Sequence, residues 1–311
     1  MSFDAPPIDS TLSLSSELHR LGLTHAGTTL SALSRGDIHE TRRVLKRLRA
    51  VLCLADGDRM ASKADKALRN VGRMLSTTRD LEVSRELLPS FTGHLSTREE
   101  QQLNALLDPA AQRHTAIERA LPILHNVCLD LYEWQPEADW GTLGKAVARS
   151  YRLAMSRLKE CRDHARAARK PPKGNTQKIK PLSEPLHEMR KELKRLSHQL
   201  CLLPAESGEE PSPEVSPEPS PSWLERKKAE VRRASQLLGQ EHDLHIFQER
   251  LGSHARLVLP ILGPRRSVLQ NEAIESAAHF LRKKPGAFYR RLETHLARIQ
   301  ERASREISCS P

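Results

Sequence analysis

Residues 38–54, IHETRRVLKRLRAVLCL, and residues 186–202, LHEMRKELKRLSHQLCL, are two versions of one cationic segment. A shift of 148 positions aligns the His-x-x-Arg of the two segments, the Lys-Arg-Leu that follows it and the closing Leu-Cys-Leu. Agreement at so many positions, in the same order, indicates that the chain contains an internal duplication.

A second pair of segments supports the duplication. Residues 68–87 align with residues 231–250 at a shift of 163, which places Asp80 on Asp243. Because the shift has grown from 148 to 163, the second copy carries an insertion between its two motifs. The acidic, proline-rich segment 204–222 lies there and contains no Lys or Arg. Such a segment cannot bury enough apolar surface to fold, so it is predicted to be a disordered loop.

The composition favours a helical protein with an anionic partner. The 311 residues include 50 Lys and Arg against 39 Asp and Glu, a formal charge of +11. An excess of this size is typical of proteins that bind nucleic acid, a phosphate polymer or an acidic membrane surface. The five cysteines are scattered singly, which favours reduced thiols over a zinc site or a disulfide framework.

Neither a signal peptide nor a membrane span is predicted. The N-terminus lacks a basic region followed by an apolar run. No stretch approaches the ~18 consecutive apolar residues of a membrane-spanning helix. We therefore expect a soluble, cytoplasmic protein that does not interact with membranes.

Apolar residues recur at spacings of three and four through most of the chain, and strand signals are nearly absent, so the predicted fold class is all-α. Two matching sets of four helices predict two four-helix bundles related by internal duplication. The first bundle is expected in residues 1–135 and the second in 142–305, with loop 204–222 inside it. The expected helices are 10–34, 38–55, 61–88, 97–133, 142–169, 185–203, 222–252 and 266–305.

The duplicated helix is expected to be strongly two-sided. On a helix, His39, Arg42, Arg43 and Lys46 share about one third of the circumference, and apolar residues occupy the opposite side. Asp37 followed by Glu40 resembles a capping box that begins the helix. The second copy repeats this face, and shorter basic stripes recur at residues 66–73 and 145–159.

A basic face is commonly no more than a solvated surface. Like charges four residues apart on a helix repel each other by a few tenths of a kcal/mol, however, so solvated faces usually mix signs. These stripes are almost purely cationic and recur in both copies. A bound polyanion would explain why that repulsion is tolerated.

The segments His-x-x-Arg-(Arg/Lys)-x-x-Lys-Arg-Leu at 39–48 and 187–196 resemble the CHAD family, the conserved histidine α-helical domain. The stretch 238–244 and its partner 75–81 support the resemblance, which covers about residues 10–305. The family resemblance implies pseudo-twofold symmetry between the two bundles, binding of inorganic polyphosphate and association with polyphosphate granules. We expect no enzymatic activity, metal or cofactor. Arg49 departs from full symmetry, because Ser197 stands at its counterpart.

We expect the two copies to line one cationic path that a long polymer contacts at the same time. The candidate polyphosphate-binding residues are His39, Arg42, Arg43, Lys46, Arg47, Arg49, Arg69, Arg73, Lys145, Arg149, Arg152, His187, Arg190, Lys191, Lys194, Arg195, Lys228 and Arg232.

Two other functions fit the residues less well. Nucleic acid is one, because phosphate contacts alone can hold duplex DNA. Single-strand binders, however, interleave aromatic and basic residues, and aromatics are only 4% of this chain. A metal-dependent phosphohydrolase is the other, because Asp80 and Asp243 recur in the duplication. Neither has a second carboxylate or histidine three or four residues later, so pairing with arginine is the favoured interpretation.

Overall fold

The computed structural model describes residues 7–168, 182–205 and 222–309, and these ranges form helices and no β-strand. The all-α prediction is confirmed. The α-helices are α1 Leu14–Ser34, α2 Ile38–Leu52, α3 Arg59–Met74, α4 Ser76–Leu87, α5 Thr97–Leu106, α6 Ala110–Tyr132, α7 Trp140–Ala168, α8 Ser183–Leu202, α9 Trp223–Leu251, α10 Leu259–Phe280 and α11 Pro285–Cys309, with 3₁₀ helices η1 Leu88–His94 and η2 Gly252–Leu257.

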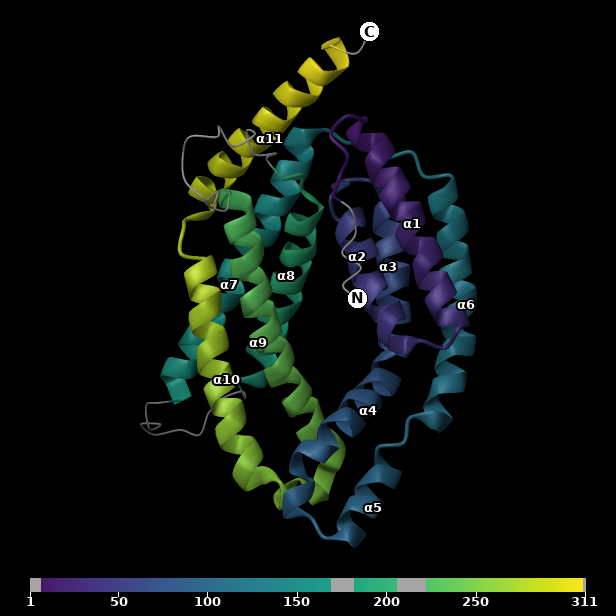
Figure 1. Ribbon diagram of the computed structural model, residues 1–311, viewed down its shortest axis with the longest axis vertical. Helices are drawn as coiled ribbons and strands as arrows, with labels where there is room; N and C mark the ends of the chain where they lie inside the picture. Colours follow the sequence, from purple (N-terminus) through teal and green to yellow (C-terminus); the bar gives the residue numbers. More distant parts are fainter. Residues whose placement is uncertain (1–6, 169–181, 206–221, 310–311) are drawn as a thin grey trace, which may run out of the picture.

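Helices α2 and α8, which carry the two copies of the motif, pack against each other in the middle of the molecule (Figure 1). On one side, α1 packs on α2 and α6, and α3 packs on α6. On the other side, α8 packs on α7 and α9, and α10 packs on α9. A second connection joins α4 to α9 at the lower end of the view. The duplicated motif therefore lies at the centre of the fold.

The main apolar core is continuous across the α2–α8 junction. It includes Leu45 and Leu48 of α2 together with Leu193 and Leu196 of α8, all buried. A second, smaller cluster joins α4, η1 and α5 to α9 and α10. Apolar burial thus connects the two copies of the motif to each other. The division of the chain into two bundles at residues 135–142 stays a prediction.

Several expected helices end earlier than the periodicity indicates. The expected helix 61–88 is divided at Leu75 into α3 and α4, and the Ser76 hydroxyl donates to the Arg73 carbonyl at this point. The expected helix 97–133 is divided before α6 at Pro109, because proline has no N–H to continue the helix. The expected count of eight helices is therefore wrong.

The C-terminal boundaries also differ from the expectation. The expected helix 266–305 corresponds to two helices, α10 and α11, and α11 begins at Pro285, where a helix start tolerates proline. In the described ranges, no helix combines the length and the apolar character that crossing a membrane requires. The predicted disordered loop 204–222 falls mainly on residues 206–221, which lie outside the described residues.

The smaller core predicts how the lower end of the molecule responds to mutation. The rings of Phe91 and Phe247 stack with centroids 5.1 Å apart, and both side chains are fully buried. We expect Phe247→Ala to lower the free energy of unfolding by about 3–5 kcal/mol, measured by urea denaturation, because it leaves a cavity opposite Phe91. Phe247→Leu keeps much of the volume and should cost clearly less. Equal losses for the two variants would contradict this packing.

Candidate functional site

Helix α2 begins after an aspartate that caps its N-terminus, and one side of the helix is buried. The Asp37 carboxylate accepts a hydrogen bond from the Glu40 backbone N–H at 2.9 Å. The reciprocal half of the expected capping box is absent, because the Glu40 carboxylate pairs with Arg43 instead. Ile38, Thr41 and the leucines at 45, 48 and 52 are buried, as the periodicity predicts. The basic side chains of α2 lie on the opposite side of the helix.

Helix α8 repeats the arrangement. Leu186, Met189 and the leucines at 193, 196 and 200 are buried, so Arg190 and Lys194 emerge on the remaining side. Because α2 and α8 pack against each other, the basic faces of the two motif copies are brought together.

A cluster of like charges results at this junction. Arg42, Lys46, Arg190 and Lys194, here called the central cations, are all partly buried. Burial, together with the charges of Arg190, Arg42 and Lys194, lowers the pKa of Lys46 to about 7. Burial also lowers the pKa of the other three central cations. Loss of hydration and mutual repulsion therefore act together here.

Two carboxylates face the central cations. Asp80 pairs with Arg250 at 3.2 Å, and Arg42 and Arg190 act on it electrostatically. Arg190 and Lys46 act in the same way on Asp243. Burial nevertheless raises the pKa of both carboxyl groups. The Asp80–Arg250 contact agrees with the interpretation that Asp80 pairs with arginine, and for Asp243 this pairing stays a prediction.

A cavity of about 200 Å³ opens beside the central cations. It is called the cationic cavity here, because it contains three arginines and one lysine, and no Asp or Glu is among the described residues that line it. Helix α2 contributes Arg43 and Arg47, α8 contributes Lys194, and α9 contributes Arg232. Four of the predicted residues therefore meet at one surface. The remaining lining residues are Ser197, His198, Cys201, Leu202, Ser235 and Gln236.

Two polar atoms of the cationic cavity are buried without a hydrogen-bond partner among the described residues. They are the hydroxyl of Ser235, a residue that is 5% exposed, and Nε2 of His198. Burial lowers the pKa of His198 to about 3, with Lys194 and Arg47 adding to the effect. Unsatisfied buried polar atoms are costly, so a ligand that supplies oxygen atoms would relieve this cost.

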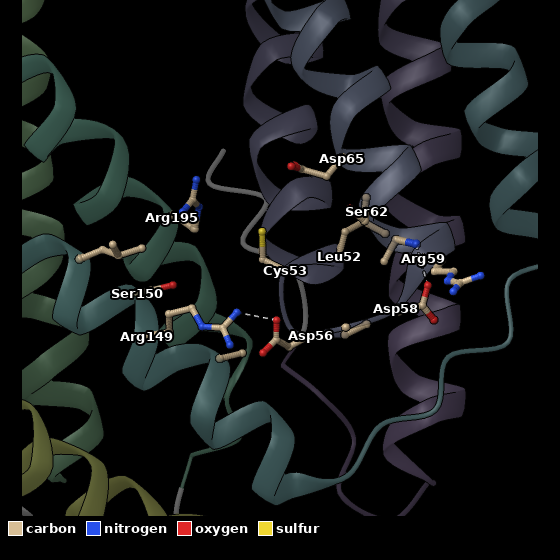
Figure 2. Close-up of a pocket in the computed structure, with 15 residues that line it drawn as sticks. Leu52, Cys53, Asp56, Asp58, Arg59, Ser62, Asp65, Arg149, Ser150 and Arg195 are labelled. Carbon is tan, nitrogen blue, oxygen red and sulfur yellow. Dashed lines mark hydrogen bonds and ion pairs between the residues drawn. The ribbon is translucent and has the colours of Figure 1, made fainter.

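A larger cavity, of about 470 Å³, lies between the α2–α3 connection and helices α7 and α8 (Figure 2). We call it the mixed-charge cavity, because three arginines and three aspartates line it. Arg149 reaches across to Asp56 at 2.7 Å (Figure 2). Asp65 accepts ion pairs of 2.7 Å from both Arg49 and Arg69. Three of the predicted binding residues are therefore neutralised by carboxylates at this cavity.

The two motif histidines differ in their surroundings. His39 is exposed in the first turn of α2, as expected. His187 is partly buried, and its Nδ1 lies 3.4 Å from Nδ1 of His242. Burial, together with the charges of Arg190 and His187, lowers the pKa of His242 to about 2. His242 therefore lies beside the central cations, close enough for the charge of Arg190 to act on it.

The remaining predicted residues lie apart from the two cavities, except Arg195, which lines the mixed-charge cavity. Arg73, Lys145 and Arg152 are exposed, and neither cavity includes them among its lining residues. Lys191 and Lys228 lie outside the lining of the two cavities as well. These five residues are not gathered at the central junction.

The helical stripes are less purely cationic than the sequence pattern indicates. Arg43, Lys191, Arg195 and Lys228 each form an ion pair with a glutamate three residues earlier. Sequence reasoning did not predict these ion pairs, although the i,i+3 spacing is a recognisable signal. It also missed Asp65, which stands four residues before Arg69, and Ser235 and Gln236, for which the sequence contains no signal.

The comparisons agree with this architecture. The family model of the CHAD domain matches residues 23–210, well over half of the chain, and the chain belongs to this family. A search of curated proteins found no match. Among solved structures, the chain is similar to the crystal structure of the CHAD domain from the plant Ricinus communis, at 17% identity and a TM-score of 0.54. The match covers 91% of this chain and 95% of that chain, so the two share the fold.

The lowered pKa of Lys46 predicts that this residue reduces the stability of the folded protein to an extent that depends on pH. The folded chain holds Lys46 at a pKa of about 7, against an ordinary value of 10.5 in the unfolded chain. Between these values the unfolded chain binds more protons, so the stability that depends on Lys46 rises with pH across this window. We therefore expect Lys46→Met to be more stable than the unsubstituted protein at about pH 6, by about 1–3 kcal/mol, and to lose this advantage towards about pH 10.

Urea denaturation at several pH values measures this difference. Lys46→Arg is the matched control, because it keeps the charge and removes the titration, and it should show no gain of stability with rising pH. A loss of stability in Lys46→Met at low pH would mean that Lys46 forms a favourable structural contact instead.

Proposed function

We propose that the protein binds inorganic polyphosphate in the cationic cavity and along the adjacent central cations, without catalysing a reaction. The observation that carries this proposal is the cationic cavity itself, where Arg43, Arg47, Lys194 and Arg232 converge from three helices. An arginine fork and a lysine point charge are both suited to phosphate oxygens.

The shape of the site favours an unbranched phosphate chain over nucleic acid. The cavity has a volume of about 200 Å³, and no Phe, Tyr or Trp is among the described residues that line it. Single-stranded nucleic acid is usually held by bases stacked on aromatic rings. A bare phosphate chain presents oxygens along its whole length, and the buried Ser235 hydroxyl and His198 Nε2 are available to bind them.

Both copies of the motif contribute to the proposed site. Arg43 and Arg47 come from the first copy, and Lys194 comes from the second. A polymer that reaches both copies gains from a high effective concentration for the second contact. The duplication, read as two four-helix bundles related by a pseudo-twofold axis, would thus have a functional reason. The proposal extends to association with polyphosphate granules in the cytoplasm, as the family resemblance implies.

Charge reversal in the cationic cavity tests the proposal. We expect Arg47→Glu combined with Lys194→Glu to weaken binding of long-chain polyphosphate by at least about tenfold, because phosphate contacts are lost and repulsion replaces them. The matched control is Arg73→Glu combined with Arg152→Glu, which makes the same change of charge at exposed positions outside both cavities. Isothermal titration calorimetry at several salt concentrations measures both variants.

Equal losses in the two double variants would contradict a localised site and leave only general attraction by net charge. Stronger binding of duplex DNA than of polyphosphate, at equal phosphate concentration and salt, would favour the nucleic-acid alternative. Metal-dependent release of phosphate that disappears in Asp243→Ala would instead establish an enzyme.

A further inference from the structure

The mixed-charge cavity, of about 470 Å³, lies outside the polyphosphate site proposed above. Small-molecule sites in proteins commonly have volumes of about 300–1,000 Å³, so this cavity is large enough for a ligand of its own. The α2–α3 connection bounds it on one side, and α7 and α8 bound it on the other (Figure 2). Its lining offers three groups to a ligand: a hydroxyl, an ion pair and an exposed apolar side chain.

The hydroxyl is that of Ser150 on α7. Ser150 is only 5% exposed, and its hydroxyl has no hydrogen-bond partner among the described residues. Hydroxyls inside helices commonly donate to the carbonyl four residues earlier, as those of Thr28 and Ser84 do in this fold. The Ser150 hydroxyl instead points into the cavity (Figure 2). A fixed polar group of this kind is suited to hold one polar atom of a ligand.

The ion pair joins Arg149 of α7 to Asp56 of the α2–α3 connection at 2.7 Å (Figure 2). It uses one N–H of the Arg149 guanidinium, which has five. It also uses one carboxylate oxygen of Asp56. Both oxygens of Asp58 and of Asp65, in contrast, already accept from donors among the described residues. Arg149 and Asp56 therefore each keep the capacity for a further charged partner.

The apolar side chain is that of Leu153, three residues after Ser150 on α7. It lines the cavity and is 39% exposed, which is unusual for a leucine in this fold. Leu52 and Ala146, which are buried, line the same cavity. An aliphatic group bound here would remove the exposed surface of Leu153 from water, which is favourable.

We propose that the mixed-charge cavity binds a small zwitterion with an aliphatic group, of the chemical class of the branched-chain α-amino acids. The ligand carboxylate binds Arg149 and the Ser150 hydroxyl, the ligand ammonium binds Asp56, and the aliphatic group contacts Leu153. A ligand with both charges adds one partner to each member of the ion pair. A ligand with a single charge would instead compete for one member and leave the other unpaired. Binding of such a zwitterion does not depend on the proposed polyphosphate site.

Three related ligands test this assignment on the unsubstituted protein. Leucine carries both charges, N-acetylleucine lacks the ammonium, and leucine amide lacks the carboxylate. We expect leucine to bind with a Kd below about 1 mM, and the two derivatives to bind at least about tenfold more weakly, because each loses a charge-assisted contact. Ligand-observed NMR titration measures all three affinities. Equal affinities of the three ligands, or no binding of leucine at about 10 mM, would overturn the proposal.

Variants of the ion pair assign the two charged groups of the ligand. In Arg149→Met, leucine should bind at least about fivefold more weakly and no better than leucine amide, since its carboxylate has lost a partner. In Asp56→Asn, leucine should lose as much and bind no better than N-acetylleucine. The matched control is Arg152→Met on the same helix, which removes the same charge at an exposed position outside the cavity. A leucine affinity in Arg149→Met equal to that in the control would count against the proposal.

Polyphosphate affinity separates the zwitterion site from the proposed function. Arg149 does not line the cationic cavity, so Arg149→Met should bind long-chain polyphosphate within about twofold of the Arg152→Met control. Ser150→Ala, which leaves both charges in place, should weaken leucine binding at least about threefold. Absence of leucine binding in a protein that binds polyphosphate would overturn the zwitterion site alone. Leucine binding without polyphosphate binding would overturn the proposed function alone.

Discussion

Four cationic side chains held partly buried between α2 and α8 are the constraint on which the rest of this structure depends. Burial and mutual repulsion both oppose the charged form of Lys46, and they lower its pKa to about 7. The repulsion is tolerated because α2 and α8 are fixed by an apolar core that continues across their junction. The two neighbouring carboxylates, Asp80 and Asp243, neutralise only part of the positive charge of the four cations. The fold thus maintains a local excess of positive charge that an anionic ligand would stabilise.

The charges around this junction differ between the two copies of the motif, because a few corresponding positions carry different residues. Ser197 takes the place of Arg49, and Lys228 takes the place of Asp65. In the first copy, Arg49 and Asp65 form an ion pair, whereas in the second copy neither partner of that pair is present. The cavity beside the second copy is lined instead by Lys194 and Arg232, together with Arg43 and Arg47 of the first copy. The loss of symmetry at these positions is as informative about function as the symmetry elsewhere.

Much of the central fold could be predicted from the sequence. The duplicated segment has a strong helical period and a clear apolar side, so α2, α8 and their buried leucines follow from the pattern. The divisions at Leu75 and Pro109 were missed, because the apolar period continues on both sides of them. Local chemistry decides these helix ends, such as the Ser76 hydroxyl that donates to the Arg73 carbonyl.

The candidate site was predicted in part, for a similar reason. Periodicity identifies residues that share a helix face, and it grouped Arg43 with Arg42 and Lys46 on α2. Arg47 was a candidate through the family motif. Periodicity cannot show which cations are neutralised from another helix, as Arg149 is by Asp56. It also cannot show that Ser235 of α9 lies in the same cavity, since that proximity depends on how the helices pack.

The most direct test of this account is the number of protons that the protein takes up when it binds long-chain polyphosphate at about pH 8. Titration calorimetry in buffers with different ionisation enthalpies measures this number. With a pKa of about 7, Lys46 is mainly neutral at this pH in the free protein, and a polyanion beside it should restore its proton. The account predicts uptake approaching one proton, which is lost in Lys46→Arg. Binding without proton uptake, or with the same uptake in Lys46→Arg, would show that the polymer binds away from the central cations.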